Sequence, residues 1–212
     1  MRNCIKEIVI FAGYIFRMGF MVPQDLHIHT VFSTGDSAIV KEQTPEFIYR
    51  IRHAEIIGIS DHFEYVVEPY VFEKYEKEVR KYGFDLGTEI SGFSLVNEAI
   101  KTSCDYFIYH CSEDEDYHAI DLLLGTEKPV IIAHPLILGT DLKRVPTECY
   151  IEINNRYIWR NNWRSGLSPF IDRFKFVVSS DAHQPGWLNQ NVARYVCREL
   201  GIRESILFPG KT

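Results

Sequence analysis

Histidines and carboxylates recur in this chain at spacings that suit a metal site. His27 and His29 are separated by one residue within a β-prone run, so on a strand both imidazoles project from the same face. Asp181 and His183 repeat this spacing with a carboxylate and an imidazole. Imidazole nitrogens and carboxylate oxygens together bind borderline divalent ions such as Zn, Mn and Fe. These two pairs therefore predict that the protein binds divalent metal.

Other histidines and acids follow segments that favour β-strands. Short runs rich in β-branched and aromatic residues alternate with amphipathic stretches from Pro23 onward, and no long linker interrupts them. Strands are expected over residues 24–28, 55–60, 84–90, 105–110, 129–133, 149–154 and 175–180, and helices over 44–54, 68–82, 93–103, 116–125, 157–165 and 187–200. This alternation predicts parallel β/α units, closed as a barrel or open as a doubly wound sheet.

Six of the eight histidines stand at or just beyond the end of an expected strand. They are His27, His29, His62, His110, His134 and His183, and the carboxylates Glu89 and Asp181 occupy equivalent positions. The carboxyl ends of all strands of a β/α barrel meet on one face, so we expect these side chains to share one pocket. His53 and His118 fall within expected helices and are assigned to the surface or the core. The acidic run 113–116 is expected to be a solvated loop.

The composition is that of one globular domain. The chain has 212 residues, of which 46% are hydrophobic and 25% charged, so it can bury a sizeable core without disulfides. Five widely spaced cysteines without a CxxC motif indicate a reducing, cytoplasmic location. A formal net charge of −6 disfavours nucleic acid bound through the overall field of the protein. No GxSxG, P-loop or GxGxxG motif occurs, so neither serine-hydrolase, NTPase nor dinucleotide chemistry is indicated.

Residues 1–22 form an extension before the expected single domain, which covers residues 23–212. They contain the apolar run 8–16 between basic residues, which loosely imitates a signal peptide. The run is too short to span a bilayer and no small-residue cleavage site follows it, so no membrane association is expected. We expect either an additional helix packed on the domain or a start codon assigned upstream of the true one.

Taken in order, these motifs resemble those of the PHP superfamily (polymerase and histidinol phosphatase), and most of all its small stand-alone phosphoesterases. The motifs are Asp25-Leu26-His27-x-His29-Thr30, Ser60-Asp61-His62, Gly87-x-Glu89, His110, Ala133-His134-Pro135, Glu152-Ile153-Asn154-Asn155 and Ser180-Asp181-Ala182-His183. The resemblance covers residue 24 to about residue 200. It implies a distorted seven-stranded (β/α) TIM-like barrel with two or three divalent metal ions (Zn, Mn or Fe) at the carboxyl ends of the strands.

The resemblance also implies roles for individual residues. His27, His29, Glu89 and Asp181 would hold one ion, Glu89 would bridge to a second ion bound by His110 and His134, and His62 and His183 would hold a third. Asp181, Glu89 and His183 would carry the catalytic roles, with a protonated His183 or the third ion stabilising the leaving oxygen. The family commonly has a histidine or aspartate where this chain has Thr34 and Gly35. Asp36 is the candidate substitute ligand, and the alternative is a third site that is weak, empty or filled only with substrate.

Polar residues near these motifs are candidates for supporting roles. Asp25, Asp61 and Glu152 are expected to orient imidazoles or bound water. Arg156 is expected to bind substrate, because a guanidinium can hold a phosphate through two hydrogen bonds. Asn155 is expected to assist it.

The expected activity is metal-dependent hydrolysis of a phosphate ester, with a small phosphorylated metabolite or nucleotide as substrate and histidinol phosphatase as one candidate of this class. Two ions bridged by a carboxylate can clamp phosphoryl oxygens and deprotonate a shared water near neutral pH. One alternative is a phosphodiesterase or exonuclease at nucleic-acid ends, which would need a basic track that the net charge of −6 disfavours. The other is a degenerate, regulatory metal-binding module, for which Thr34 and Gly35 are the best support.

Overall fold

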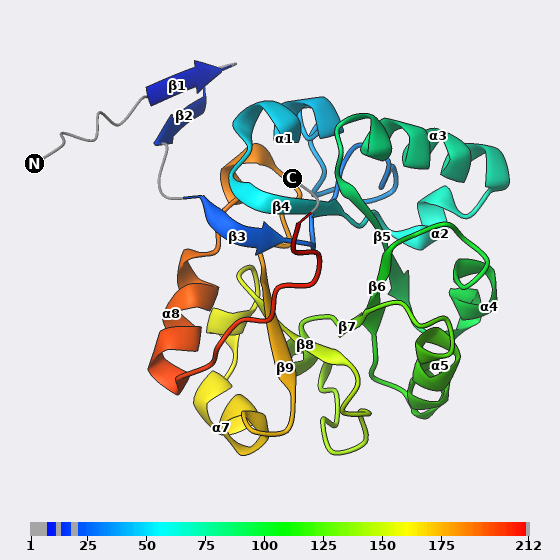
Figure 1. The fold of residues 1–212 in the computed structure, drawn as a ribbon, viewed down its shortest axis with the longest axis vertical. Coiled ribbons are helices and arrows are strands. Elements are labelled where there is room, and N and C mark those ends of the chain that lie inside the picture. Colours follow the sequence, from blue (N-terminus) through cyan, green and yellow to red (C-terminus); the bar gives the residue numbers. More distant parts are fainter. Residues whose placement is uncertain (1–7, 12–13, 18–20, 211–212) are drawn as a thin grey trace, which may run out of the picture.

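The computed structural model describes residues 8–11, 14–17 and 21–210, and its centre is one curved sheet of seven parallel strands (Figure 1). The strands are β3 (Val22–Asp25), β4 (Ala54–Ile59), β5 (Asp85–Ser91), β6 (Tyr106–His110), β7 (Val130–Ile132), β8 (Tyr150–Asn154) and β9 (Lys175–Ser179). Each strand pairs with the next one in sequence, in the order β3-β4-β5-β6-β7-β8-β9. The fold is therefore a distorted TIM-like barrel, and the barrel alternative predicted from the sequence is confirmed.

Helices connect the strands and lie around the outside of the sheet (Figure 1). They are α1 (Pro45–Ile51), α2 (Phe63–Val66), α3 (Pro69–Lys81), α4 (Val96–Ala99), α5 (Asp114–Leu124), α6 (Pro135–Leu138), α7 (Trp163–Leu167) and α8 (Asn191–Leu200), with short 3₁₀ turns at Phe93–Leu95, Ile158–Arg160, Ser168–Phe170 and Pro185–Trp187. Helix α1 begins as expected, because Thr44 accepts a hydrogen bond from the Phe47 N–H at 3.1 Å. The helix expected over 157–165 is broken, since the side chain of Asn162 caps a new helix at Trp163.

The barrel interior is filled by alternate residues of the strands. Tyr106 and Ile108 of β6 point inward with Leu26, Ile131, Ala133 and Val177, and together they form a cluster separate from the main core under the helices. The Tyr106 hydroxyl donates a 2.6 Å hydrogen bond to the Leu26 carbonyl. A Cβ on Gly58 would lie 2.2 Å from the Tyr106 hydroxyl oxygen, so only glycine leaves room for this ring. Because side chains alternate along β6, His110 faces the same interior one step further along.

The seam of the barrel, between β9 and β3, is closed differently at its two ends. At the carboxyl end, the segments that follow β9 and β3 pair directly, since the Asp181 N–H donates to the His27 carbonyl at 2.9 Å. At the other end the C-terminal segment lies between them. The Ser205 N–H donates to the Phe176 carbonyl at 2.8 Å, and Gln24 donates to the Ser205 carbonyl at 2.6 Å. The direct closure therefore occurs where the predicted site residues lie.

The N-terminal extension contains two short antiparallel strands, β1 (Ile8–Phe11) and β2 (Tyr14–Arg17). The helix expected in residues 1–22 is therefore wrong over these eight residues, and the rest of the extension up to residue 20 lies outside the described residues. β-branched and aromatic side chains dominate both strands and favour extended backbone. The domain boundary at residue 22 stays a prediction. None of the helices in the described part of the chain is long and apolar enough to cross a membrane.

The acidic run 113–116 is not a solvated loop. Glu113 is the N-cap of α5, and the carboxylate of Asp116 accepts hydrogen bonds from the N–H groups of Ser112 and Glu113, both at 2.9 Å. Asp116 is buried as a result. Acidic side chains are stabilised in the first turn of a helix by its unpaired N–H groups and its dipole, which is why this run forms a helix start.

Candidate metal centre

Eight side chains that were predicted from the sequence meet at the carboxyl ends of the strands. His27 and His29 follow β3, His62 follows β4, Glu89 lies in β5, His110 ends β6, His134 follows β7, and Asp181 and His183 follow β9. All are buried except His62 and His110, which are half-buried. A pocket of about 290 Å³ opens onto seven of them, and His27 lies beneath it. The structure thus brings residues that are up to 156 positions apart in the sequence into one site.

Glu89 is at the centre of this group. Its Oε1 lies 2.6 Å from Nε2 of His110 and 3.1 Å from Nε2 of His27. Its Oε2 lies 2.7 Å from Nδ1 of His62 and 3.4 Å from Nε2 of His29. Nε2 of His134 is 3.7 Å from Oε1. One buried carboxylate is therefore surrounded by five imidazoles.

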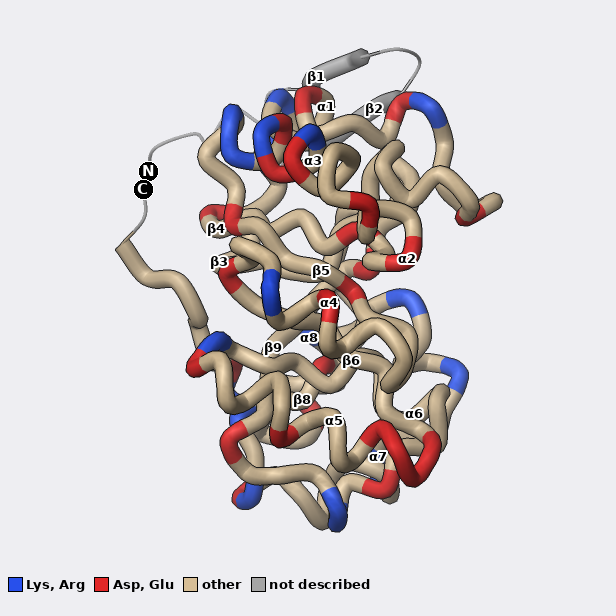
Figure 2. Tube along the Cα trace, turned by 90° about the vertical axis from the view of Figure 1, so that its right-hand side faces the viewer, with Lys and Arg blue, Asp and Glu red and all other residues tan. Residues whose placement is uncertain are grey.

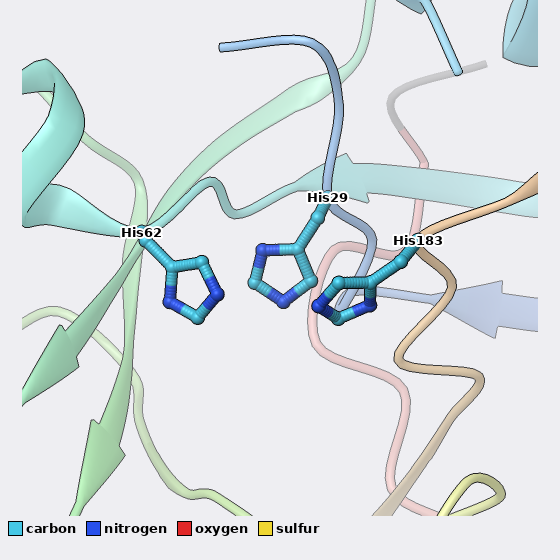
Figure 3. Close-up of side chains that lie close together, drawn as sticks. All are labelled: His29, His62 and His183. Carbon is cyan, nitrogen blue, oxygen red and sulfur yellow. The ribbon is translucent and has the colours of Figure 1, made fainter. Parts of the chain in front are cut away.

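Three overlapping triads of these residues have ligand atoms within 4.8 Å of one another. They are His27–His29–Glu89, Glu89–His110–His134, and His29–His62–His183. Figure 3 shows the third triad, in which rings from three separate segments of the chain point toward one another. Glu89 belongs to two triads and His29 to two, so ions held in adjacent triads would share a ligand.

The contacts within the group fit a metal ion better than a hydrogen-bond network. Nδ1 of His62 and Oε2 of Glu89 are buried and have no partner with hydrogen-bond geometry, although they are close to each other. Nδ1 of His134 is also buried without a partner. Nε2 of His27 lies 3.0 Å from Nε2 of His29, so two imidazole nitrogens face each other. Polar atoms left in this state cost free energy unless a cation binds them, and neutral imidazoles with a carboxylate are a donor set for Zn, Mn or Fe.

The pKa values of Glu89 and His29 favour the states that bind a cation, whereas those of His27 and His62 are raised and favour protonated rings. Burial alone would raise the pKa of Glu89, but His110, His27 and His29 hold it well below its usual range. For His29, burial and the neighbouring imidazoles outweigh Glu89 and lower the pKa well below its usual range. Burial would also lower the pKa of His62, yet the adjacent Glu89 raises it to about 9. Glu89 is therefore ionised and His29 keeps a lone pair, as metal binding requires.

Glu152 contacts the imidazole of His27 and the backbone N–H of His134 from outside the group. Its Oε1 lies 2.7 Å from Nδ1 of His27, and its Oε2 accepts hydrogen bonds from the His134 N–H at 2.7 Å and from the Asn154 amide at 3.0 Å. Burial would raise the pKa of Glu152, but His27 lowers it to about 2. A carboxylate behind a ligand imidazole fixes the tautomer and makes the facing nitrogen more basic. The supporting contact predicted for Glu152 is present in the structure.

The carboxylates of Asp61 and Asp25 hydrogen-bond to partners outside the three triads. The carboxylate of Asp61 accepts hydrogen bonds from the Thr30 N–H and hydroxyl, at 2.7 and 2.6 Å, and from the Ser33 hydroxyl at 2.7 Å. It therefore braces the loop that follows His29, and burial raises its pKa to about 6. Asp25, the last residue of β3, contacts His53 and the Ser180 N–H instead.

His53 explains the position of Asp25. Its Nε2 lies 2.8 Å from Oδ2 of Asp25, whose Oδ1 accepts the Ser180 N–H at 3.0 Å. His53 lies two residues beyond the end of α1 instead of inside it, and it belongs to none of the three triads. His118 lies within α5 as expected and is exposed.

Two residues of the group have strained backbone conformations. His134 has φ 25° and Asp181 has φ 54°, both in the left-handed region that non-glycine residues rarely adopt. Such conformations cost on the order of 1 kcal/mol and persist where the surrounding structure requires them, most often at functional sites. At Asp181 the requirement is visible, because its N–H is held by the His27 carbonyl at the seam.

Asp36 occupies the position expected of a substitute ligand. Its Oδ2 lies 2.9 Å from Nε2 of His183 and 3.3 Å from Nε2 of His62. A Cβ on Gly35 would lie 2.3 Å from Cε1 of Tyr65, so the ring of Tyr65 fills the place of a side chain at residue 35. The next residue supplies the carboxylate beside the third triad instead.

Arg156 reaches the pocket, whereas Asn155 does not. Nη1 of Arg156 lies 3.4 Å from Oδ1 of Asp181 and 3.1 Å from both ring nitrogens of His183. The Asn155 side chain accepts hydrogen bonds from the N–H groups of Val192 and Ala193, at 2.9 and 3.1 Å. It caps the first turn of α8, which needs such acceptors. Asn155 does not line the pocket, so its predicted role in substrate binding stays a prediction.

Three residues of the pocket were not anticipated. Tyr157 lines it, with its ring centroid 5.1 Å from that of His134, and Ile137 and Leu138 of α6 form an apolar edge. Pro135 directly after His134 is a signal for the first position of a helix and would have predicted α6. Nothing in the sequence marks Tyr157.

No protein-family model and no curated protein matches this sequence. Among solved structures, the dihydropteroate synthase of Yersinia pestis is similar to this chain, with a TM-score of 0.44 and 12% sequence identity over 93% of this chain and 90% of that one. The strand order of this chain defines its fold by itself. Fold and site together define a TIM-like barrel protein with buried His/Glu/Asp clusters that could hold metal ions.

Proposed function

We propose that this protein is a metal-dependent phosphoesterase of the PHP type that hydrolyses phosphate esters of a small metabolite or nucleotide. The observation that carries the proposal is the position of Glu89, which belongs to two of the three triads and whose oxygens contact imidazoles of all three. Ions that share a bridging carboxylate in this way activate water and bind phosphoryl oxygens. Hydrolysis adds the water oxygen to phosphorus and breaks the ester P–O bond, and the leaving oxygen takes up a proton.

The residues of the chain have separate roles in this proposal. Glu89 and Asp181 supply negative charge that holds the ions, and Glu152 keeps the His27 ring in place through its 2.7 Å contact. The guanidinium of Arg156 lines the pocket and can bind a phosphoryl oxygen. Burial lowers the pKa of His183, and the nearby Arg156 contributes in the same direction. Of the two roles expected for His183, metal ligand is therefore favoured over proton donor.

A small substrate is favoured over nucleic acid. The pocket of about 290 Å³ is near the lower end of the usual size of a small-molecule site. The net charge is −6, and in Figure 2 lysines and arginines lie in short separate segments among acidic ones. A nucleic-acid substrate would require a continuous run of positive charge beside the pocket.

The test combines elemental analysis of the purified protein with turnover of p-nitrophenyl phosphate and bis-p-nitrophenyl phosphate, before and after chelation. We expect two or three metal ions per chain and monoester turnover that chelation abolishes. Asp181→Asn, which preserves volume and tolerates positive φ, should reduce turnover at least a hundredfold, whereas Asp172→Asn on the exposed surface should not. Turnover of the diester alone would indicate the phosphodiesterase alternative, and bound metal without turnover the regulatory one. A protein that takes up no metal would contradict the proposal.

A further inference from the structure

The carboxylate of Asp25 connects the two edges of the barrel seam. Asp25 is the last residue of β3 and is fully buried. Its Oδ1 accepts the N–H of Ser180, in the segment after β9, at 3.0 Å. The next residue, Asp181, donates its own N–H to the carbonyl of His27 at 2.9 Å. The contact of Asp25 therefore lies one residue before the backbone pairing that brings together two residues of the candidate metal centre.

Asp181 needs this anchoring because its backbone is strained. Its φ of 54° belongs to the left-handed region, which a non-glycine residue keeps only where the surrounding structure requires it. The hydrogen bonds of the Ser180 and Asp181 N–H groups fix the two peptide groups that precede its Cα. With the backbone held in this way, Oδ1 of Asp181 lies 3.6 Å from Nε2 of His29 and 3.9 Å from Nε2 of His27, beside the first triad.

His53 holds the other oxygen of the Asp25 carboxylate. Its Nε2 lies 2.8 Å from Oδ2 of Asp25, and its side chain is 10% exposed. Its carbonyl accepts the Val22 N–H at 3.1 Å, which fixes His53 to the start of β3. Nδ1 of the ring is buried without a hydrogen-bond partner among the described residues, so Asp25 orients this ring. A buried carboxylate requires such a partner, because burial of an unpaired charge is costly.

A second side chain bridges the same seam further from the metal centre. The amide of Gln190 donates hydrogen bonds to the carbonyls of Gln24 in β3 and Val178 in β9, at 2.8 and 3.1 Å. Gln190 is buried as well. Its two partners stand three residues before His27 and Asp181 in the sequence. The seam therefore contains one bridge next to the candidate ligands and one remote from them.

We infer that Asp25 and His53 form a positioning pair for the metal centre. They hold Asp181 in its left-handed conformation and in register with His27, so that the Asp181 carboxylate lies beside the first triad. Neither member of the pair belongs to a triad. The inference rests on the metal binding in the proposed function, and it does not require that the protein hydrolyses phosphate esters.

The double variant Asp25→Val/His53→Leu tests the pair. Replacement of both members leaves no unpaired buried charge, and valine suits a strand. We expect the affinity for one of the bound ions to fall about tenfold or more, as for other residues that support metal ligands indirectly. Competition with a chromogenic chelator measures the affinities, and circular dichroism checks the fold. Unchanged affinities in the folded double variant would overturn the inference. If the double variant does not fold, Asp25→Ser, whose hydroxyl is too short to reach both partners of Asp25, is measured in the same way.

Two further variants separate positioning from other effects. Gln190→Met removes the remote bridge across the same seam and should leave the affinities nearly unchanged. An equal loss in Gln190→Met and in the double variant would show that any weakening of the seam disturbs the site, and would contradict the inference. Asp25→Asn keeps an oxygen for the Ser180 N–H and an amide that faces His53, so it should retain most of the affinity. A full loss in Asp25→Asn would show that the charge of Asp25 supports the ions and that its hydrogen bonds do not.

Amide hydrogen exchange of the metal-free protein gives a readout that does not involve activity. Exchange of the Ser180 and Asp181 N–H groups should become about tenfold faster or more in the double variant, because local opening of the seam there is no longer opposed. If the protein binds ions but hydrolyses no ester, and the double variant loses both affinity and protection, the phosphoesterase proposal fails and the positioning pair stands. Hydrolysis of esters by a double variant with unchanged affinity and exchange would do the reverse.

Discussion

Oε1 of Glu152 lies 2.7 Å from Nδ1 of His27, and both side chains are fully buried. This contact leaves Nε2 of His27 facing His29 and Glu89, at 3.0 and 3.1 Å. Because a buried imidazole with one nitrogen held by a carboxylate can present only the other, Glu152 decides which atom of His27 is available as a ligand.

Glu152→Gln should therefore weaken metal binding without unfolding the protein. We expect a 10- to 100-fold loss of affinity, on the order reported for residues that hold ligand imidazoles. Competition with a chromogenic chelator measures the affinity, and circular dichroism checks the fold. Glu148→Gln on the exposed surface is the matched control. Unchanged affinity in Glu152→Gln would show that the carboxylate does not orient a ligand.

Gly35→Ala should disturb the third triad, because its Cβ would meet the ring of Tyr65 at 2.3 Å. Overpacking typically costs about 1–3 kcal/mol, and because the Tyr65 ring is 36% exposed and can turn aside, we expect the lower part of that range. The loop carries Asp36. We expect a lower free energy of unfolding and fewer bound ions per chain.

The double variant Gly35→Ala/Tyr65→Ala removes the clash and serves as the control. It should recover much of the stability lost in Gly35→Ala, since the two positions contact each other directly and their effects should not add. If the two substitutions lower the free energy of unfolding additively in denaturant titrations, the contact between Tyr65 and Gly35 does not determine the conformation of the loop that carries Asp36.

Removal of metal should lower the thermal stability of the protein. Without an ion, Nδ1 of His134 and Oε2 of Glu89 remain buried without hydrogen-bond partners. For metal present at a hundred times its dissociation constant, linkage predicts a decrease in Tm of about 5–10 °C on chelation. Differential scanning fluorimetry before and after chelation measures it, and the value should return when Zn or Mn is added back. A Tm that chelation does not change would argue against a resident ion.

Phe208→Ala should destabilise the barrel without affecting the metal centre. The Phe208 ring packs 5.7 Å from that of Tyr106, in the segment that closes the seam away from the site. Loss of this half-buried ring should cost about 1–3 kcal/mol. Denaturant unfolding and chelator competition on the same variant separate the two effects. If the variant stays folded but binds metal more weakly, the C-terminal end of the seam and the metal centre are not independent.

The sequence by itself determined the alternation of strands and helices and the histidines at the strand ends. Both follow from local chemistry, because β-branched runs favour strands and each strand end is marked by a polar residue directly after an apolar run. The seven predicted strands are each present within three residues at either end. The first 22 residues show the limit of this reasoning, since their apolar run suits a helix or two strands equally by hydrophobicity alone.

Only the tertiary structure decided which of these residues contact each other. Asp25 and Glu152 were equivalent as acids near strand ends, yet one pairs with His53 and the other with His27. That difference depends on the direction in which each side chain leaves its strand and on what faces it across the barrel, 125 positions away in the case of Glu152. The same reason places Asp36 beside His183. Sequence spacing shows which side chains share one face of a strand. Which side chains they contact across the barrel is decided only when the barrel closes.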